Sequence, residues 1–366
     1  MQKWFTILLI VLSFFGLSHI FAADVSNTYR SQGTQTAPHK EGKAVHASEQ
    51  ATDFFNETNP VPISKPAHPT LYGVALGDEE KHVYSLLGQP ERREPSVLGY
   101  DWLIYQPGGE RYVQIGVHQG KVVDVYSNAP DASIGSVAIG MPYSDLTERL
   151  TFARKVTFAY ANANIEITNQ QTERPLFLDK ETPIMYYLDK HDQGKVTGLR
   201  LIDKGMLLKG SFYDTKWTYQ GDSPNFNPPV LSSEQQEQVD RAHELQILDL
   251  VNVIRHRHRL GKLEWNKEAA DVARNHSEDM RAHQFFDHVS ATTGLDPFQR
   301  LKQKNITYTL AGENIAAGFP DAIEAFHSWM NSASHRKNVL EKDFTQLGVG
   351  VTKDYYTQDF IAPHSS

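Results

Sequence analysis

Apolar and polar positions alternate along the first half of the chain, which is typical of β-strands exposed on one face. Six segments follow this pattern: residues 100–105, 112–118, 121–126, 155–167, 184–188 and 195–202. The second and third are separated by a Gln-Gly turn, which predicts a hairpin. Two stretches, 78–87 and 141–150, instead repeat apolar residues at helical spacing, and each follows a short segment bounded by glycines. The repetition predicts an α+β domain of two similar halves over residues 70–219.

Helical spacing dominates the second half of the chain. A first helix is expected after Ser232 or Ser233, which can cap it together with Gln235 or Gln236, and a good helix end follows at Gly261. Further helices are predicted after Asn266, near residues 297–301 and over 322–330, and strands over 347–351 and 355–362. Helices on both sides of a small antiparallel sheet predict a three-layer α/β/α sandwich over residues 239–366.

The remaining segments are an N-terminal apolar stretch and two linkers. Residues 1–22 carry Lys3, an apolar run and Ala22, which is typical of an export signal cleaved near Ala22. The alternative is an uncleaved anchor, and membrane contact is then expected only through this segment. Both alternatives place the rest of the chain outside the cytoplasmic membrane, secreted or attached to the cell envelope. Residues 23–69 are a flexible polar linker, and residues 220–238 a proline-containing one.

Composition narrows the possible functions. The chain of 366 residues has a net charge of −8, which argues against a dedicated nucleic-acid-binding protein, since such proteins need a basic surface. It contains no cysteine, so disulfides, thiolate metal sites and a cysteine nucleophile are excluded. Any metal must therefore be held by His, Asp or Glu. The basic run at residues 255–259 ends a predicted helix, where cations offset the helix dipole, and we interpret it as a solvated face.

Candidate chemistry gathers in three segments of the second half: residues 285–288, 312–316 and 334–336. His335 follows the helix over 322–330 and a run of small residues, so a position in a loop facing a cleft is expected. His276 lies on the apolar stripe of a predicted helix and is expected to be packed. A Ser–His–Glu triad of Ser332 or Ser334 with His335 and Glu313 is disfavoured, because nothing marks either serine as a strained or exposed nucleophile.

Two parts of the chain resemble known families. The segment around Val83 to Pro90, with the Trp and Tyr strands after it, resembles the N-terminal CAP-associated domain of secreted bacterial proteins. The second half is similar to the CAP (SCP/PR-1-like) family in its bacterial secreted form. Six ordered motifs carry this similarity: residues 250–255, 273–277, 285–288, 312–316, 329–340 and 347–350.

The resemblance implies an α-β-α sandwich with a central cleft, which in many members holds two histidines and two glutamates and can bind zinc. Carried over by motif, His288 and His335 take the histidine positions and Glu313 the first glutamate position. Ser332 stands where the second glutamate would be. The implied cleft is lined by these four residues and Asn314. The implied metal ligands, if zinc binds, are His288, His335 and Glu313, with water completing the shell. These three residues are also the only catalytic candidates.

Three functions are compatible with these observations. The one we favour is a non-catalytic extracellular module whose cleft binds a small apolar or lipid ligand or a cell-wall component, with zinc as an optional ligand. The second is a metal-dependent hydrolase acting on an envelope peptide or polymer. The third is a structural or adaptor protein. The serine in place of the second acid makes the four-residue site incomplete, and an incomplete site favours binding over catalysis.

Overall fold

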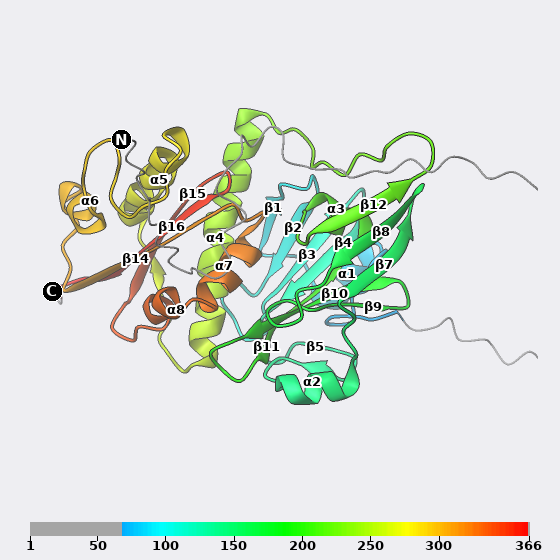
Figure 1. Ribbon diagram of the computed structural model, residues 1–366. Helices are drawn as coiled ribbons and strands as arrows, with labels where there is room; N and C mark the ends of the chain where they lie inside the picture. Colours follow the sequence, from blue (N-terminus) through cyan, green and yellow to red (C-terminus); the bar gives the residue numbers. More distant parts are fainter. Residues whose placement is uncertain (1–67, 365–366) are drawn as a thin grey trace, which may run out of the picture. The chain divides into compact units, whose positions relative to one another are not determined.

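The computed structural model describes residues 68–364, which lie in one compact unit (Figure 1). The expected export signal at 1–22 and nearly all of the linker at 23–69 lie outside the described residues. Within 68–364, no helix has the length and apolar character needed to cross a bilayer.

The first half of the described chain is built mainly from strands. Its helices are α1 (Glu80–Leu87), α2 (Tyr143–Arg149) and α3 (Lys204–Lys209). Its strands are β1 (Arg92–Pro95), β2 (Asp101–Tyr105), β3 (Val113–His118), β4 (Lys121–Ser127), β5 (Ser133–Ile134), β6 (Val137–Ala138), β7 (Lys155–Tyr160), β8 (Ala163–Thr168), β9 (Leu176–Asp179), β10 (Thr182–Asp189), β11 (Lys195–Ile202) and β12 (Thr215–Tyr219). All six segments predicted from alternation contain a strand, and β3 and β4 form the expected hairpin.

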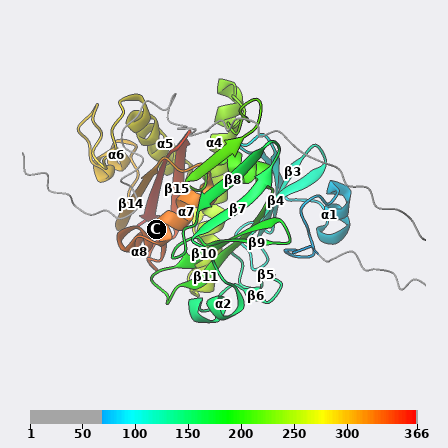
Figure 2. The same ribbon diagram turned by 45° about the vertical axis from the view of Figure 1, so that its right-hand side comes forward.

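The two predicted halves meet in one seven-stranded sheet with the order β1-β2-β3-β4-β11-β10-β9. The first half supplies β1 to β4 after α1, and the second supplies β9 to β11 after α2. Antiparallel pairing of β4 with β11 joins them, with Leu199 opposite Ser127. A smaller sheet, β12-β8-β7, packs nearby (Figure 2). This arrangement agrees with the predicted α+β domain.

The second half is a layered arrangement of helices on a four-stranded sheet. Its helices are α4 (Ser233–Arg257), α5 (Lys267–Ala282), α6 (Pro297–Gln303), α7 (Ala322–Met330) and α8 (Ala333–Val339). Its strands are β13 (Glu264–Trp265), β14 (Leu310–Ala317), β15 (Gln346–Thr352) and β16 (Tyr355–Ala362), in the order β13-β15-β16-β14. The side chains that alternate along β15 and β16 face α5 on one side and α4 and α7 on the other. This is the predicted α/β/α sandwich.

Helix boundaries follow local signals closely. Ser232 caps α4 in a capping box with Gln235, as predicted, so α4 begins inside the segment expected to be the 220–238 linker. The predicted helix over 322–330 coincides with α7. Three expectations were wrong. Helix α4 ends at Arg257, four residues before the helix end predicted at Gly261. His335 lies in the first turn of α8 rather than in a loop. Arg255, expected to be solvated, is fully buried and donates hydrogen bonds to the carbonyls of Val339 and Phe344.

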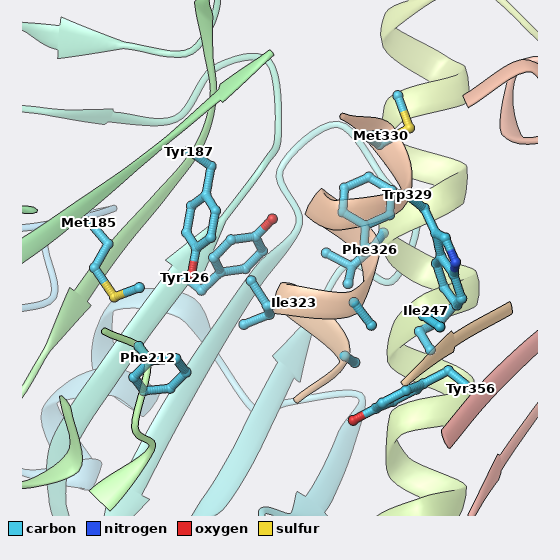
Figure 3. Close-up of a cluster of buried hydrophobic side chains, with 14 of the residues drawn as sticks. Tyr126, Met185, Tyr187, Phe212, Ile247, Ile323, Phe326, Trp329, Met330 and Tyr356 are labelled. Atoms are coloured by element: carbon cyan, nitrogen blue, oxygen red, sulfur yellow. The ribbon is translucent and has the colours of Figure 1, made fainter. Parts of the chain in front are cut away.

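A single cluster of buried apolar side chains joins the two halves (Figure 3). Tyr126 and Tyr187 from the seven-stranded sheet lie opposite Ile323 and Phe326 of α7 in this cluster. Helix α4 contributes Ile247 and also packs against β1 and β15. Because the cluster contains residues of both halves, burial of apolar surface holds them together.

Candidate functional site

Glu313 of β14 is the centre of the candidate site. Its position on β14 turns the side chain toward α5 and α6, where it is buried with only 2% of the side chain exposed. One carboxylate oxygen accepts a hydrogen bond from His288 Nδ1 at 2.7 Å, and the other is paired with the Arg300 guanidinium. The His288 side chain is 49% exposed, so it forms the solvent-facing edge of the group. The prediction that His288 and Glu313 come together therefore agrees with the geometry.

Asn314, the next residue on β14, points to the opposite face of the sheet and braces α8. Its amide donates to the backbone carbonyl of His335 at 3.1 Å and to Gln358 Oε1 at 3.0 Å. Its own oxygen accepts from Asn338 at 2.9 Å. Asn314 is fully buried, so it acts as a strut that ties α8 to the sheet rather than as a cleft-lining group.

His335 and Ser332 lie on the segment that Asn314 holds. Burial, together with nearby His288, lowers the pKa of His335 to about 4, so its imidazole is neutral at physiological pH. Ser332 is the N-cap residue of α8, and its hydroxyl lies 3.3 Å from that of Ser334 rather than on His335. The triad that the sequence disfavoured has no support in this arrangement.

Two residues of the site carry no motif that the sequence analysis identified. Arg300 donates to the carbonyls of His288 and Leu295 as well as to Glu313, so it fixes the loop that carries His288. Asp359 of β16 lies directly opposite Glu313 in the strand register and is fully buried. Burial, reinforced by the negative charge of Glu313, raises the pKa of Asp359 well above its usual range. The alternation along β16 was the signal that could have placed Asp359 on this face.

The predicted zinc ligands do not fit a metal centre. Both oxygens of Glu313 are engaged, and one of them by the positive charge of Arg300, which disfavours a second cation at the same carboxylate. Within residues 68–364, no three or more His, Asp or Glu side chains are arranged to hold a metal ion. Glu313 instead forms a hydrogen-bonded, ion-paired group with His288 and Arg300.

A cavity of about 260 Å³ lies beside this group, between α5, α6 and the turn that joins them. Most of its lining residues can form hydrogen bonds, and only Val272 and Leu295 are apolar. The lining residues are Val272, Asn275, His276, Asp279, Ser290, Thr292, Thr293, Leu295, Arg300, Gln303 and Lys304. Arg300 belongs both to the cavity wall and to the Glu313 group, so the two share a side chain.

The cavity wall is held rigidly by its own hydrogen bonds. Asp279 accepts from Ser290 at 2.6 Å and from Thr292 at 3.0 Å, which orders the turn. His276, which is buried as predicted, places Nε2 2.9 Å from the carbonyl of Asp287. Because a carbonyl only accepts, Nε2 carries the proton. Burial lowers the pKa of His276, so the ring is neutral and Nδ1 is an acceptor.

Comparisons with known proteins agree with both resemblances. The family model "CAP-associated N-terminal" matches residues 76–213, and that of the cysteine-rich secretory protein family, CAP, matches residues 248–362. The Bacillus subtilis (strain 168) protein "Uncharacterized membrane protein YlbC" is 36% identical over 289 residues, which are 78% of this chain and 82% of that protein. "Uncharacterized protein YkwD" of the same organism is 40% identical over 122 residues, 33% of this chain and 47% of that protein.

Two solved structures have the same fold. An extracellular protein containing a SCP domain from Bacillus anthracis str. Ames is 33% identical, with a TM-score of 0.72 over 78% of this chain and 93% of that one. A cysteine-rich secretory protein from Staphylococcus aureus subsp. aureus Mu50 is 21% identical, with a TM-score of 0.67 over 78% of this chain and 91% of that one, and shows a likeness of fold alone. With its four-stranded α/β/α sandwich behind a strand-rich CAP-associated N-terminal domain, the chain belongs to the CAP family of bacterial SCP-domain proteins.

Proposed function

We propose that this protein works outside the cytoplasmic membrane and binds a polar component of the cell wall at the cavity beside Glu313. The N-terminal segment is of the export type, and a solved relative is described as an extracellular protein. Another relative is named a membrane protein. Secretion and attachment to the envelope both agree with these observations.

The polar lining of the cavity carries the proposal. Nine of the eleven lining residues carry a hydrogen-bonding group, as counted from the lining residues given above, while carbon atoms make up slightly more than half of the exposed wall. A long alkyl chain would leave most of these groups without a partner, and a buried polar group without a partner costs free energy. Hydroxyl and amide groups of a cell-wall glycan or its peptide can pair with Asn275, Thr293 and Gln303. Of the ligands considered from sequence, the lining favours the cell-wall component.

The geometry also favours binding over hydrolysis. To activate a water molecule in the cavity, Glu313 would have to face it, yet Glu313 is buried, paired with His288 and Arg300, and does not line the cavity. The hydrolase alternative would also rely on a metal that the three candidate ligands do not fit. The Glu313 group therefore shapes and orders the cavity wall, and no catalytic step is proposed.

Isothermal titration with a soluble disaccharide-peptide fragment of peptidoglycan tests this function. We expect saturable binding by the full chain. Asn275→Leu, which places an apolar side chain in the cavity, should weaken it by about tenfold or more, equivalent to one or two lost hydrogen bonds. Glu278→Gln changes an exposed residue of the same helix outside the cavity and is the matched control. No binding of the fragment, together with recovery of a lipid from the natively extracted protein, would contradict the proposal.

A further inference from the structure

The junction between α7 and α8, Asn331 and Ser332, is held by the CAP-associated domain. Residues 188–191, at the end of β10, reach this junction and form three hydrogen bonds with Asn331. The Asn331 amide donates to the carbonyl of Leu188 at 3.0 Å, and its side-chain oxygen accepts from the backbone N–H of Lys190 at 3.0 Å. His191 Nε2 lies 3.1 Å from the Asn331 carbonyl. Both ends of the Asn331 side chain are therefore satisfied from the other domain.

An ion pair adds a second attachment one helical turn further on. Arg336, next to His335, donates to Asp189 Oδ2 at 2.8 Å, and the other Asp189 oxygen accepts from the backbone of His191 at 2.9 Å. Only 6% of the Asp189 side chain and 13% of the Arg336 side chain are exposed. A pair this shielded from solvent is far less screened than a surface salt bridge, and removal of one partner leaves the other charge unpaired.

The start of α8 depends on these attachments because its own sequence stabilises it poorly. Ser332 stands at the N-cap, but its side chain makes no capping hydrogen bond. The helix has seven residues, too few to be stable by itself in water. The carbonyl of His335 is tied to Asn314 on the side of the sheet. Residues 188–191 provide the restraint on the opposite side.

We propose that residues 188–191 form a positioning element for the CAP site, in which Asp189 fixes the first turn of α8 and thereby the place of His335. The CAP-associated domain then helps to position the residues of the CAP site. Asp189 touches no ligand in this scheme and acts through Arg336. The inference concerns the unliganded protein, so it stands apart from the proposed binding of a cell-wall component.

Hydrogen–deuterium exchange and imidazole NMR on the full chain, without ligand, test the positioning role. In Asp189→Asn, the amides of residues 336–340, which are hydrogen-bonded within α8, should exchange about tenfold faster, because local opening of α8 becomes easier. The His335 ring resonances should shift while those of His276 stay in place. Asp192→Asn is the matched control, since Asp192 pairs with Lys195 on the surface of the same turn and does not reach α8.

Three further variants keep the proposal testable if Asp189→Asn alone is inconclusive. Arg336→Gln should reproduce the effect, and the double variant should add little to either single change, because both remove the same ion pair. If Asp189→Asn fails to fold, His191→Ala removes one exposed contact to Asn331 and should still raise exchange at the hydrogen-bonded amides of Asn331, Ser332 and Arg336 by about threefold. Unchanged exchange and unchanged His335 resonances in the folded variants would overturn the proposal, even if the melting temperature fell.

Discussion

His243 of α4 is a titratable side chain held neutral inside the protein. It is 2% exposed, and neither ring nitrogen has a hydrogen-bond partner within the described residues. Burial lowers its pKa to about 4, and the attraction of Asp321 only partly offsets this effect. The ring stacks on Tyr356, with the ring centroids 6.0 Å apart. It therefore behaves as a flat apolar group whose protonation costs the fold free energy.

The consequence is a loss of stability in acid. The pKa of His243 is lower in the folded chain than the ordinary value of 6.5. The part of the folding free energy that depends on a neutral His243 is therefore fully present above about pH 6.5 and is lost as the pH falls toward 4. The shift corresponds to about 3 kcal/mol. At about pH 4, His243→Leu should retain roughly 3 kcal/mol more of its neutral-pH stability than the unsubstituted chain. Urea denaturation across this range checks it, and identical pH profiles for the two proteins would contradict it.

Asp359 allows a second test at the scale of one residue. The raised pKa of Asp359 favours the neutral carboxyl group, whose shape and charge Asn reproduces, so we expect Asp359→Asn to change the free energy of unfolding at neutral pH by less than about 1 kcal/mol. Denaturant titration of both proteins measures this difference. If Asp359 were instead ionised beside Glu313, removal of that buried charge would stabilise the protein by several kcal/mol.

At the scale of elements, two glycines of β15 decide how closely α5 approaches the sheet. A side chain at Gly348 or Gly350 would collide with the backbone of α5 at Ala270 or Arg274. The close approach brings the Ser277 hydroxyl of α5 within 2.9 Å of the Thr357 hydroxyl on β16, two residues from Asp359 and on the same face of the strand. The face of the sheet that carries Glu313 is thus packed against α5 because β15 has no side chains there.

Gly350→Ala should therefore destabilise the protein by about 3 kcal/mol or more, because the backbone of α5 cannot move aside as a flexible side chain would. Gly261→Ala is the matched control. Its Cβ would meet nothing within 4 Å, and a change of less than about 1 kcal/mol is expected. Thermal unfolding followed by circular dichroism compares the two. Equal melting temperatures would show that the close approach is not a constraint.

At the scale of the whole described chain, a buried charge cluster crosses between the domains. Arg200 of β11 donates to Asp124 of β4 at 2.7 Å and to Asp321, the N-cap of α7, at 2.9 Å. The Arg200 side chain is completely buried. Together with the shared apolar cluster, this contact should make the two domains unfold as one cooperative unit.

Arg200→Met leaves two carboxylates without their cation and should lower the free energy of unfolding by about 4 kcal/mol. Arg93→Met is the control. Arg93 also binds two carboxylates, Glu80 and Asp101, but its side chain is 45% exposed, so a loss below about 1 kcal/mol is expected. Calorimetry of the full chain should show one transition for residues 68–364. Two separate transitions, with Arg200→Met affecting only one, would contradict the coupling.

Local patterns in the sequence determined the elements and much of the fold class. The alternation of apolar and polar residues predicted the strands of the first half. Ser232 and Gln235 predicted the start of α4, and apolar residues at helical spacing predicted the bounds of α7. These signals succeed because side-chain period and capping depend on neighbours a few residues away. The family motifs also brought His288 and Glu313 together before their contact was seen.

The tertiary structure alone decided how the charges are paired. Glu313 meets Arg300 and faces Asp359 through strand register and helix packing, and Arg336 meets Asp189 across 147 residues of sequence. Periodicity assigns a residue to a face but does not name its partner on another element. For this reason, the sequence analysis predicted Glu313 as a zinc ligand, whereas in the structure Glu313 is paired with Arg300. It likewise predicted His335 in a loop, whereas His335 lies in the short helix α8, which contacts the CAP-associated domain.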